Sequence, residues 1–350
     1  MKKRVMVLFG GRSSEHEISI VSGATVAKAI PEDRYDKILV GITKEGAWLL
    51  APSVESMEDG SWKDSRIHVV LSPETDRTLL LIEGDKITRE TVDVAFPVLH
   101  GLWGEDGTVQ GLFATANLPY VGCGLLSSAV TMDKFFTKVI ADGVGVAQAA
   151  WVPVRSWELE DMDKVVAKIE SCREYPVFVK PSNAGSSVGV TKAHNREELK
   201  KGLLLAADND SKILVEEAIA GREIECAVFG YGDDAFASGV GEILAAAEFY
   251  DYDAKYNNAD SRTVVGPELP EGKEEEFRKT ALKIYKACDC FGMARVDFFL
   301  EEGTNRVVFN EINAIPGHTS ISMYPMLMER AGRPMKEYVP ELIEMAYERN

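Results

Sequence analysis

The chain has 350 residues, 45% of them hydrophobic and 27% charged, which is ordinary for a folded protein of two or three domains. Its formal net charge of −17 argues against extended nucleic-acid binding, which needs a basic surface. No apolar run approaches the roughly 20 residues of a membrane span. The five cysteines have no metal-site spacing and indicate a reducing compartment. We therefore expect a cytoplasmic protein with neither nucleic-acid nor membrane partners.

The first third alternates predicted strands with predicted helices. The strands are Arg4–Phe9, Lys37–Ile42 and Val92–Leu99, and the helices are Glu15–Ala29 and Gly107–Ala116. This alternation predicts an α/β domain with an open parallel sheet.

Two loops follow strands at the ligand-binding end of that sheet. Gly10–Glu17 lacks the G-x-G-x-x-G spacing, which disfavours a Rossmann dehydrogenase. Its Ser14 and Glu17 have the spacing of a capping box, whereas Glu15 is left as a candidate ligand contact. His100–Gly107 combines three glycines with His, Glu and Asp, and a plain loop explains only the glycines.

The middle of the chain changes character. A helix capped by Ser127 or Ser128 is expected to run to Gly143. Strands Val177–Lys180 and Val188–Lys192 flank a Gly/Ser-rich turn, whose amides and hydroxyls could close over phosphate oxygens beside Lys180. A solvated lysine beside an ordinary hairpin is the alternative. No Walker A sequence occurs, which disfavours a P-loop kinase.

The remaining chain is rich in strands. Beyond a helix at Glu197–Ala206, we expect strands Ile213–Glu217, Glu223–Phe229, Ala237–Leu244, Met293–Leu300 and Arg306–Ile312, a helix Lys273–Cys288 and two C-terminal helices. The aromatic and polar stretch Phe249–Arg262 is predicted to be a lid over a site.

The most informative pattern is carried by the last two strands. Side chains alternate along a strand, so Arg295 and Asp297 share one face, as do Glu311 and Asn313. If the strands pair, a cation, two carboxylates and an amide converge. Such hard oxygen ligands suit Mg²⁺. A solvated amphipathic hairpin is the alternative, but apolar neighbours indicate a buried setting, where unpaired charge is costly.

Taken together, the segments resemble D-alanine–D-alanine ligases of the ATP-grasp superfamily. The resemblance covers essentially the whole chain and rests on seven segments in order: FGGRSSEHEIS, HGLWGEDGTVQG, MDK, PVFVKPSNAGSSVGV, EFYDYDAKY, ARVDFF and NEINAIPGHTSISMYP.

This resemblance implies a domain division and an activity. Residues 1–125 would form the N-terminal α/β domain that binds the first D-alanine. Residues 126–219 and 220–350 would form the small and large α+β domains of an ATP-grasp fold, with the nucleotide clamped between their sheets. The implied reaction joins two D-alanines through an acyl phosphate, for peptidoglycan precursors and cell-wall synthesis. A homodimer is expected.

The resemblance also implies roles for individual residues. ATP would be bound by Lys134, Lys180, Ser187, Glu216, Glu217, Ile219, Glu223, Lys255 and Asn310. Two Mg²⁺ ions, or Mn²⁺ in their place, would be bound by Asp297, Glu311 and Asn313. Substrate positioning and catalysis would fall to Glu15, Ser186, Tyr256, Arg295, Gly317 and Ser322, with His100 at the first D-alanine and Met323 at the second.

Two departures from the family pattern, and two residues that bear on substrate preference, affect these roles. His318 occupies a position expected to be apolar or aromatic, and Asn183-Ala184 precedes the glycine where many members carry an acid. Tyr256 stands where D-lactate-using relatives carry histidine, which favours an amine as the second substrate. The apolar Met323 argues against D-serine. The alternatives left open are a ligase joining D-alanine to another D-hydroxy or amino acid, an ATP-binding regulator and a scaffold.

Overall fold

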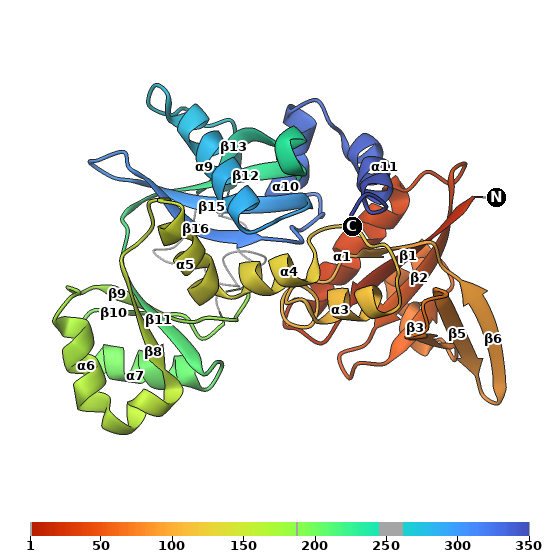
Figure 1. Cartoon of the computed structure of the whole chain (residues 1–350), viewed down its shortest axis with the longest axis horizontal. Coiled ribbons are helices and arrows are strands. Elements are labelled where there is room, and N and C mark those ends of the chain that lie inside the picture. Colours follow the sequence, from red (N-terminus) through yellow and green to blue (C-terminus); the bar gives the residue numbers. More distant parts are fainter. Residues whose placement is uncertain (1, 187, 245–261, 350) are drawn as a thin grey trace.

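The computed structural model describes residues 2–186, 188–244 and 262–349. These residues form three β-sheets with flanking helices. Figure 1 shows the N-terminal and central sheets towards opposite ends of the molecule, with α4 and α5 running between them. Among the described residues, no helix is both long and apolar enough to span a membrane.

The N-terminal sheet has seven strands in the order β6-β5-β4-β3-β2-β1-β7. Strands β1 (Lys3–Gly10), β2 (Tyr35–Ile42) and β7 (Val94–Pro97) are parallel, as the alternation predicted. The sequence analysis missed an antiparallel extension made of β3 (Trp48–Ala51), β4 (His68–Leu71), β5 (Thr78–Glu83) and β6 (Lys86–Thr91). The helices of this part are α1 (His16–Ala29), α2 (Val54–Asp59) and α3 (Thr108–Thr115).

Two local predictions in this part are wrong. The capping box of Ser14 and Glu17 does not form. Instead, the Ser13 hydroxyl accepts from the Glu15 amide at 3.2 Å, and Glu17 pairs with Lys44 at 3.1 Å. Ser13 is in turn held by the carbonyl of His100, so a contact between loops takes precedence over the local cap.

The single helix expected from Ser127 or Ser128 to Gly143 is also wrong. It is two helices, α4 (Leu125–Met132) and α5 (Lys134–Gly143), which meet at Asp133. Asp133 is extended, and its carboxylate accepts from the amides of Phe135 and Phe136, so it caps α5. Both serines lie buried inside α4.

The central sheet is antiparallel, in the order β10-β9-β11-β8. Its strands are β8 (Trp151–Arg155), β9 (Val177–Pro181), β10 (Thr191–Ala193) and β11 (Lys212–Glu217), and α6 (Met162–Glu170) and α7 (Arg196–Ala207) pack on it. The strand expected from Val188 begins only at Thr191, because the Gly/Ser-rich turn extends further than predicted.

The C-terminal sheet is antiparallel, in the order β14-β13-β12-β15-β16. The strands are β12 (Gly221–Gly230), β13 (Phe236–Leu244), β14 (Arg262–Val265), β15 (Gly292–Glu301) and β16 (Val307–Asn313), and the helices are α9 (Lys273–Ala287), α10 (Met323–Arg330) and α11 (Met335–Met345). Along β12, Ile224 belongs to the core that includes Phe277 of α9, whereas Phe229 belongs to the core that includes Tyr324 of α10. The sheet is therefore covered on both faces.

Candidate active site

Strands β15 and β16 pair as their polar side chains predicted. In the antiparallel register, Arg295 stands opposite Asn313 and Asp297 opposite Glu311. The register shifts immediately after this pair, and Asn310 is the extra residue on β16. A bulge of this kind re-aims side chains beside a site.

Arg295 is the centre of this cluster. Its Nε and Nη2 donate to the two carboxylate oxygens of Asp297 at 2.8 and 2.7 Å, and Nε lies 3.2 Å from Glu225 Oε2. Burial opposes the charge of Arg295, but Asp297 and Glu225 outweigh it and raise the pKa. Asn313 Nδ2 donates to Asp297 at 3.0 Å. Sequence reasoning missed Glu225, because alternation along β12 alone does not show what that side chain faces.

The cluster opens into a small cavity of about 80 Å³. The cavity is lined by seven predicted site residues, namely Glu15, His100, Arg295, Asn313, Gly317, Ser322 and Met323. It is therefore built from the N-terminal and C-terminal parts of the molecule together.

Two glycines crowd the carboxylate of Glu15. A Cβ added at either Gly101 or Gly185 would lie 2.7 Å from Glu15 Oε2. Gly185 belongs to the Gly/Ser-rich turn of the central sheet, so all three parts of the molecule meet near this carboxylate. Real Cβ contacts are essentially never that short, so both positions require glycine or a displaced Glu15.

His100 and Glu105 join the N-terminal loop to the segment after β16. His100 Nδ1 donates to the carbonyl of Ile315 at 3.0 Å, and its Nε2 lies 3.2 Å from Ser22 Oγ. The two side-chain oxygens of Glu105 accept from the amides of Gly101 and Ile315 at 2.7 and 3.1 Å. Burial, reinforced by Glu15, raises the pKa of Glu105 to about 8. The clustered His and Glu in this loop were the available signal for Glu105, which was given no role.

Gly317, Ser322 and Met323 shape the opposite wall. A Cβ at Gly317 would lie 2.8 Å from Ser322 Oγ, which accepts from the amide of Thr319 at 3.0 Å. Met323 is buried. His318 is also buried, among Tyr324 and Tyr338, so it fills the role of the expected aromatic residue by packing.

A second cluster of charges lies between the central and C-terminal sheets. Glu216 of β11 lies 2.8 Å from Lys180 and 3.2 Å from Lys138. Burial opposes the negative charge of Glu216, but the two lysines outweigh it and lower its pKa to about 2. Burial lowers the pKa of Lys138, whereas Glu216 raises that of Lys180 against burial. Lys138 was missed because, in the sequence, it is one lysine among others on a helix.

Lys134 links Glu311 of β16 to the Gly/Ser-rich turn. Its ammonium lies 3.2 Å from Glu311 and donates to the carbonyl of Ala184 at 3.0 Å. Glu311 and Glu223 also raise the pKa of Lys180. The charged groups predicted to meet nucleotide and metal are therefore close enough to influence one another.

Asp133 fastens the Gly/Ser-rich turn to the start of α5. It accepts from Ser182 Oγ at 2.5 Å and from Asn183 Nδ2 at 3.2 Å, and it pairs with Lys212. At the tip of the turn, Ser186 has a φ of 48°. Its hydroxyl is buried and has no hydrogen-bond partner among the described residues. An unsatisfied buried hydroxyl in a strained turn indicates a position for a ligand or a closing segment.

The other predicted residues lie as follows. Glu217 ends β11 and accepts from the amide of Ala150 at 2.9 Å, Ile219 is half-buried in the connection to β12, and Glu223 lies on β12. Ser187, Lys255, Tyr256 and most of the predicted lid lie outside the described residues.

The donor set around β15 and β16 fits a hard divalent cation. Among the described residues, no group of three or more His, Cys, Asp and Glu side chains could hold a metal. Asp297 and Glu311 instead supply two carboxylates and Asn313 an amide oxygen. Mg²⁺ is commonly bound by one or two carboxylates with substrate phosphates completing the shell. In this structure Arg295 neutralises the charge of Asp297, and both Arg295 and Asn313 donate hydrogen bonds to its carboxylate.

Sequence comparisons identify two matching families. The family described as D-ala D-ala ligase N-terminus matches residues 4–123, and the family described as D-ala D-ala ligase C-terminus matches residues 140–344. Among curated relatives, the D-alanine–D-alanine ligase of Acetivibrio thermocellus is 47% identical, with 99% of this chain and 96% of the relative covered. The ligase of the same name from Caldicellulosiruptor bescii is 48% identical, with 100% and 96% covered.

Solved structures agree over the same length. The VanG D-Ala:D-Ser ligase from Enterococcus faecalis superimposes with a TM-score of 0.89 at 36% identity, covering 99% of this chain and 100% of that one. The D-alanine-D-alanine ligase from Coxiella burnetii gives 0.85 at 33% identity, with 99% and 96% covered.

Proposed function

Because this chain belongs to the D-alanine–D-alanine ligase family, we propose that it joins two D-alanine molecules with ATP, releasing ADP and phosphate. The observation that carries the proposal is the meeting of Arg295, Asp297, Glu311 and Asn313 on paired strands beside a small cavity. The dipeptide product would serve peptidoglycan precursor synthesis in the cytoplasm.

The chemistry requires activation of a carboxylate. Transfer of the γ-phosphoryl group of ATP to the first D-alanine gives an acyl phosphate, which has a good leaving group. The free amine of the second D-alanine then attacks the carbonyl carbon, and phosphate departs. Both partners of the first step are anionic, and one opposite charge at about 4 Å is worth about 4 kcal/mol at an effective dielectric of about 20. Several cations held in fixed positions can therefore offset the repulsion between the two anions.

Arg295 is assigned to both steps. It lines the cavity and is held by Asp297 and Glu225, so its position is set before substrate arrives. We assign it the acyl phosphate and then the oxyanion of the tetrahedral intermediate, with help from the amide of Gly317. Asp297, Glu311 and Asn313 would hold two Mg²⁺ ions, or Mn²⁺. When bound, the metal would neutralise phosphate charge.

The nucleotide is assigned to the space between the central and C-terminal sheets, in the two domains 126–219 and 220–350. Lys134, Lys180 and Lys255 would contact phosphates, with Ser187 and Asn310 nearby. Glu216, Glu217 and Ile219 would meet the adenine, and Glu223 the ribose. The pairing of Glu216 with Lys180 supports this, because it fixes a buried cation on the inner strands of the central sheet.

The two D-alanines are assigned to opposite ends of the small cavity. Glu15, Ser186, Tyr256 and His100 would position the first. The unsatisfied hydroxyl of Ser186 and the crowding of Glu15 by Gly185 support a shared role for these groups. Ser322 and Met323 would hold the second.

A second candidate is ligation of D-alanine to D-serine. The similarity to a D-Ala:D-Ser ligase at 36% identity favours considering it. The buried, apolar Met323 in the cavity wall offers no hydrogen bond to a serine hydroxyl, and we therefore place D-alanine first.

The test is phosphate release from ATP and Mg²⁺ with D-alanine alone, with the product identified by mass. Formation of D-alanyl-D-alanine is expected. Phosphate release that needs added D-serine or D-lactate would transfer the assignment to a mixed ligase. Sedimentation of the purified chain would test the homodimer that we propose to form through the N-terminal domain.

A further inference from the structure

A second, larger cavity of about 340 Å³ lies in the N-terminal part of the molecule. It is bounded by residues that follow β1, by the β2–β3 turn and by the loop from Leu99 to Thr108. This is the crevice outside the carboxyl ends of β1, β2 and β7. The chain leaves β1 towards β2 on one side, and β7 lies on the other, so this is where ligands bind in open α/β sheets. The volume is within the range of small-molecule sites.

This cavity is separate from the substrate cavity. Of the residues that line the two, only His100 is common to both. The loop from His100 to Gly107 forms the partition, with Glu105 facing the substrate side and Trp103 the other.

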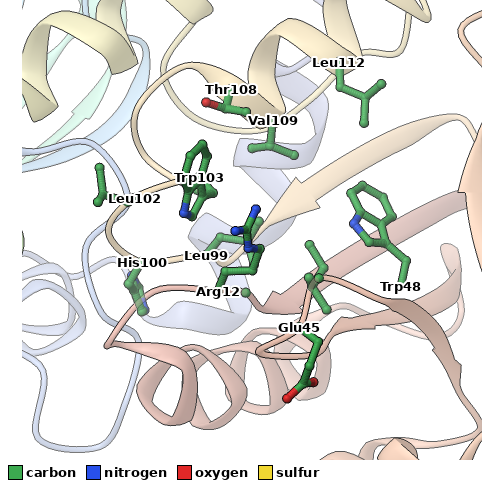
Figure 2. A pocket seen from close by; sticks show the side chains of 14 residues that line it. Arg12, Glu45, Trp48, Leu99, His100, Leu102, Trp103, Thr108, Val109 and Leu112 are labelled. Carbon is green, nitrogen blue, oxygen red and sulfur yellow. The ribbon is translucent and has the colours of Figure 1, made fainter.

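The larger cavity is lined by one arginine, Arg12, which is exposed but rests on an aromatic ring. The Arg12 guanidinium lies over the Trp103 ring, 4.9 Å from its centroid, and a Cβ at Gly46 would lie 3.2 Å from Arg12 Cδ. Among the described residues, no carboxylate lies within 4.0 Å of this guanidinium in an ion pair. The acid in the lining, Glu45, bonds within its own turn to Thr43 and points away from Arg12 (Figure 2).

The ring that holds Arg12 is fixed at a conformational cost. Trp103 has a φ of 71°, which is rare for a bulky residue, and its side chain is 47% exposed. Asp106 imposes this conformation, because one of its carboxylate oxygens accepts from the Trp103 amide at 2.8 Å and the other from the Thr108 amide at 3.0 Å. Strain maintained in this way, at an exposed aromatic residue, points to a function for the ring.

Besides Glu45, His100 and Thr108, the rest of the lining is apolar or glycine and includes a second indole. Figure 2 shows Arg12 and Trp103 on one side of the cavity and Trp48 on the other, with Val109 and Leu112 above. A planar apolar body would contact these side chains, and an anionic group would meet the guanidinium of Arg12.

We propose that this cavity is a binding site for a small aromatic carboxylate, held by Arg12 and Trp103 and distinct from the substrate site. Binding to this cavity is measured without ATP, so a negative result in the activity assay of the preceding section would leave this binding result unaffected.

The test is calorimetric titration of the full-length protein with 2-naphthoate, with neutral 2-naphthamide as the matched probe. Naphthoate is expected to bind once per chain and at least about tenfold more tightly than the amide. Arg12→Gln should weaken naphthoate binding at least about tenfold, whereas the control Arg66→Gln, at an exposed arginine in the same part of the chain, should change it less than about twofold.

Trp103→Gly separates binding from folding. Glycine relieves the positive φ, so the variant should melt no lower than the parent protein, yet it should lose naphthoate binding. Saturating D-alanine should leave naphthoate binding unchanged. Equal binding of the amide, displacement by D-alanine, or no binding to the parent protein would each overturn the proposal.

Discussion

The guanidinium of Arg295 donates two hydrogen bonds to the carboxylate of Asp297, from Nε at 2.8 Å and from Nη2 at 2.7 Å, and the two residues lie two positions apart on one strand. Planar two-point pairing fixes both the location and the orientation of a cation. The same strand therefore presents the group that we assign to the transition state and the group that we assign to the metal.

Arg295→Ala is expected to lower dipeptide formation by at least about a thousandfold, because it removes the charge that we assign to the developing oxyanion. ATP affinity should stay within about tenfold, since the nucleotide is assigned to other residues. Rates of product formation and nucleotide binding by calorimetry measure the two effects.

Arg222→Ala is the matched control. Arg222 makes an equivalent two-point pair with Glu242 on the same sheet, at 2.7 Å in each contact, and it does not line the substrate cavity. Full activity in Arg295→Ala, or equal losses in both variants, would remove the assigned role.

Asp297→Asn should raise the Mg²⁺ concentration needed for half-maximal activity by at least about tenfold, because an amide is a weaker ligand than a carboxylate. A magnesium titration of initial rate measures it, and Glu301→Gln at the outer end of the same strand is the control. An unchanged titration would exclude Asp297 as a ligand.

The buried charges around Glu216 predict unequal effects on stability. Glu216→Gln leaves two lysines without their carboxylate and should lower the free energy of unfolding by about 3–5 kcal/mol. Lys138→Met should cost clearly less, since Glu216 keeps Lys180 as its partner. Urea unfolding at pH 7 gives the free energy of unfolding of each variant. A larger loss in Lys138→Met than in Glu216→Gln would contradict this expectation.

Glu105 predicts a pH dependence. Its pKa is about 8 in the folded protein, against an ordinary value of 4.5 for an exposed glutamate, so the folded state keeps a proton that the unfolded chain releases. The contribution of Glu105 to stability should therefore fall as the pH rises from about 4.5 to about 8. The melting temperature of Glu105→Gln, relative to that of the parent protein, should therefore rise as the pH rises from about 4.5 to about 8. A constant difference between the two melting curves would contradict the shift.

The polar pattern of the last two strands could be predicted because alternation and register are local. Arg295 to Asp297 and Glu311 to Asn313 each obey the two-residue period, and one turn joins the strands. The parallel strands β1, β2 and β7 were predictable for a similar reason, because each is a buried apolar run.

The missed features depend on partners distant in sequence. The sequence marks the break at Asp133 only weakly. Aspartate is a preferred N-cap, and Met132-Asp133-Lys134 does open a helix as expected, but the partners that fix the break are Ser182, Asn183 and Lys212. Glu105 and Lys138 likewise acquire their importance from Ile315 and Glu216, which the fold brings to them. The antiparallel extension of the first sheet is made of short strands with exposed positions, which give a weak periodic signal.

The set of bonds made by Asp133 has a mechanical consequence. Because one carboxylate holds the first turn of α5, the base of the Gly/Ser-rich turn and Lys212 of β11, these segments cannot slide past one another without breaking several contacts. If the central sheet moves to admit or release nucleotide, Lys134 and the turn must move with it as one rigid body.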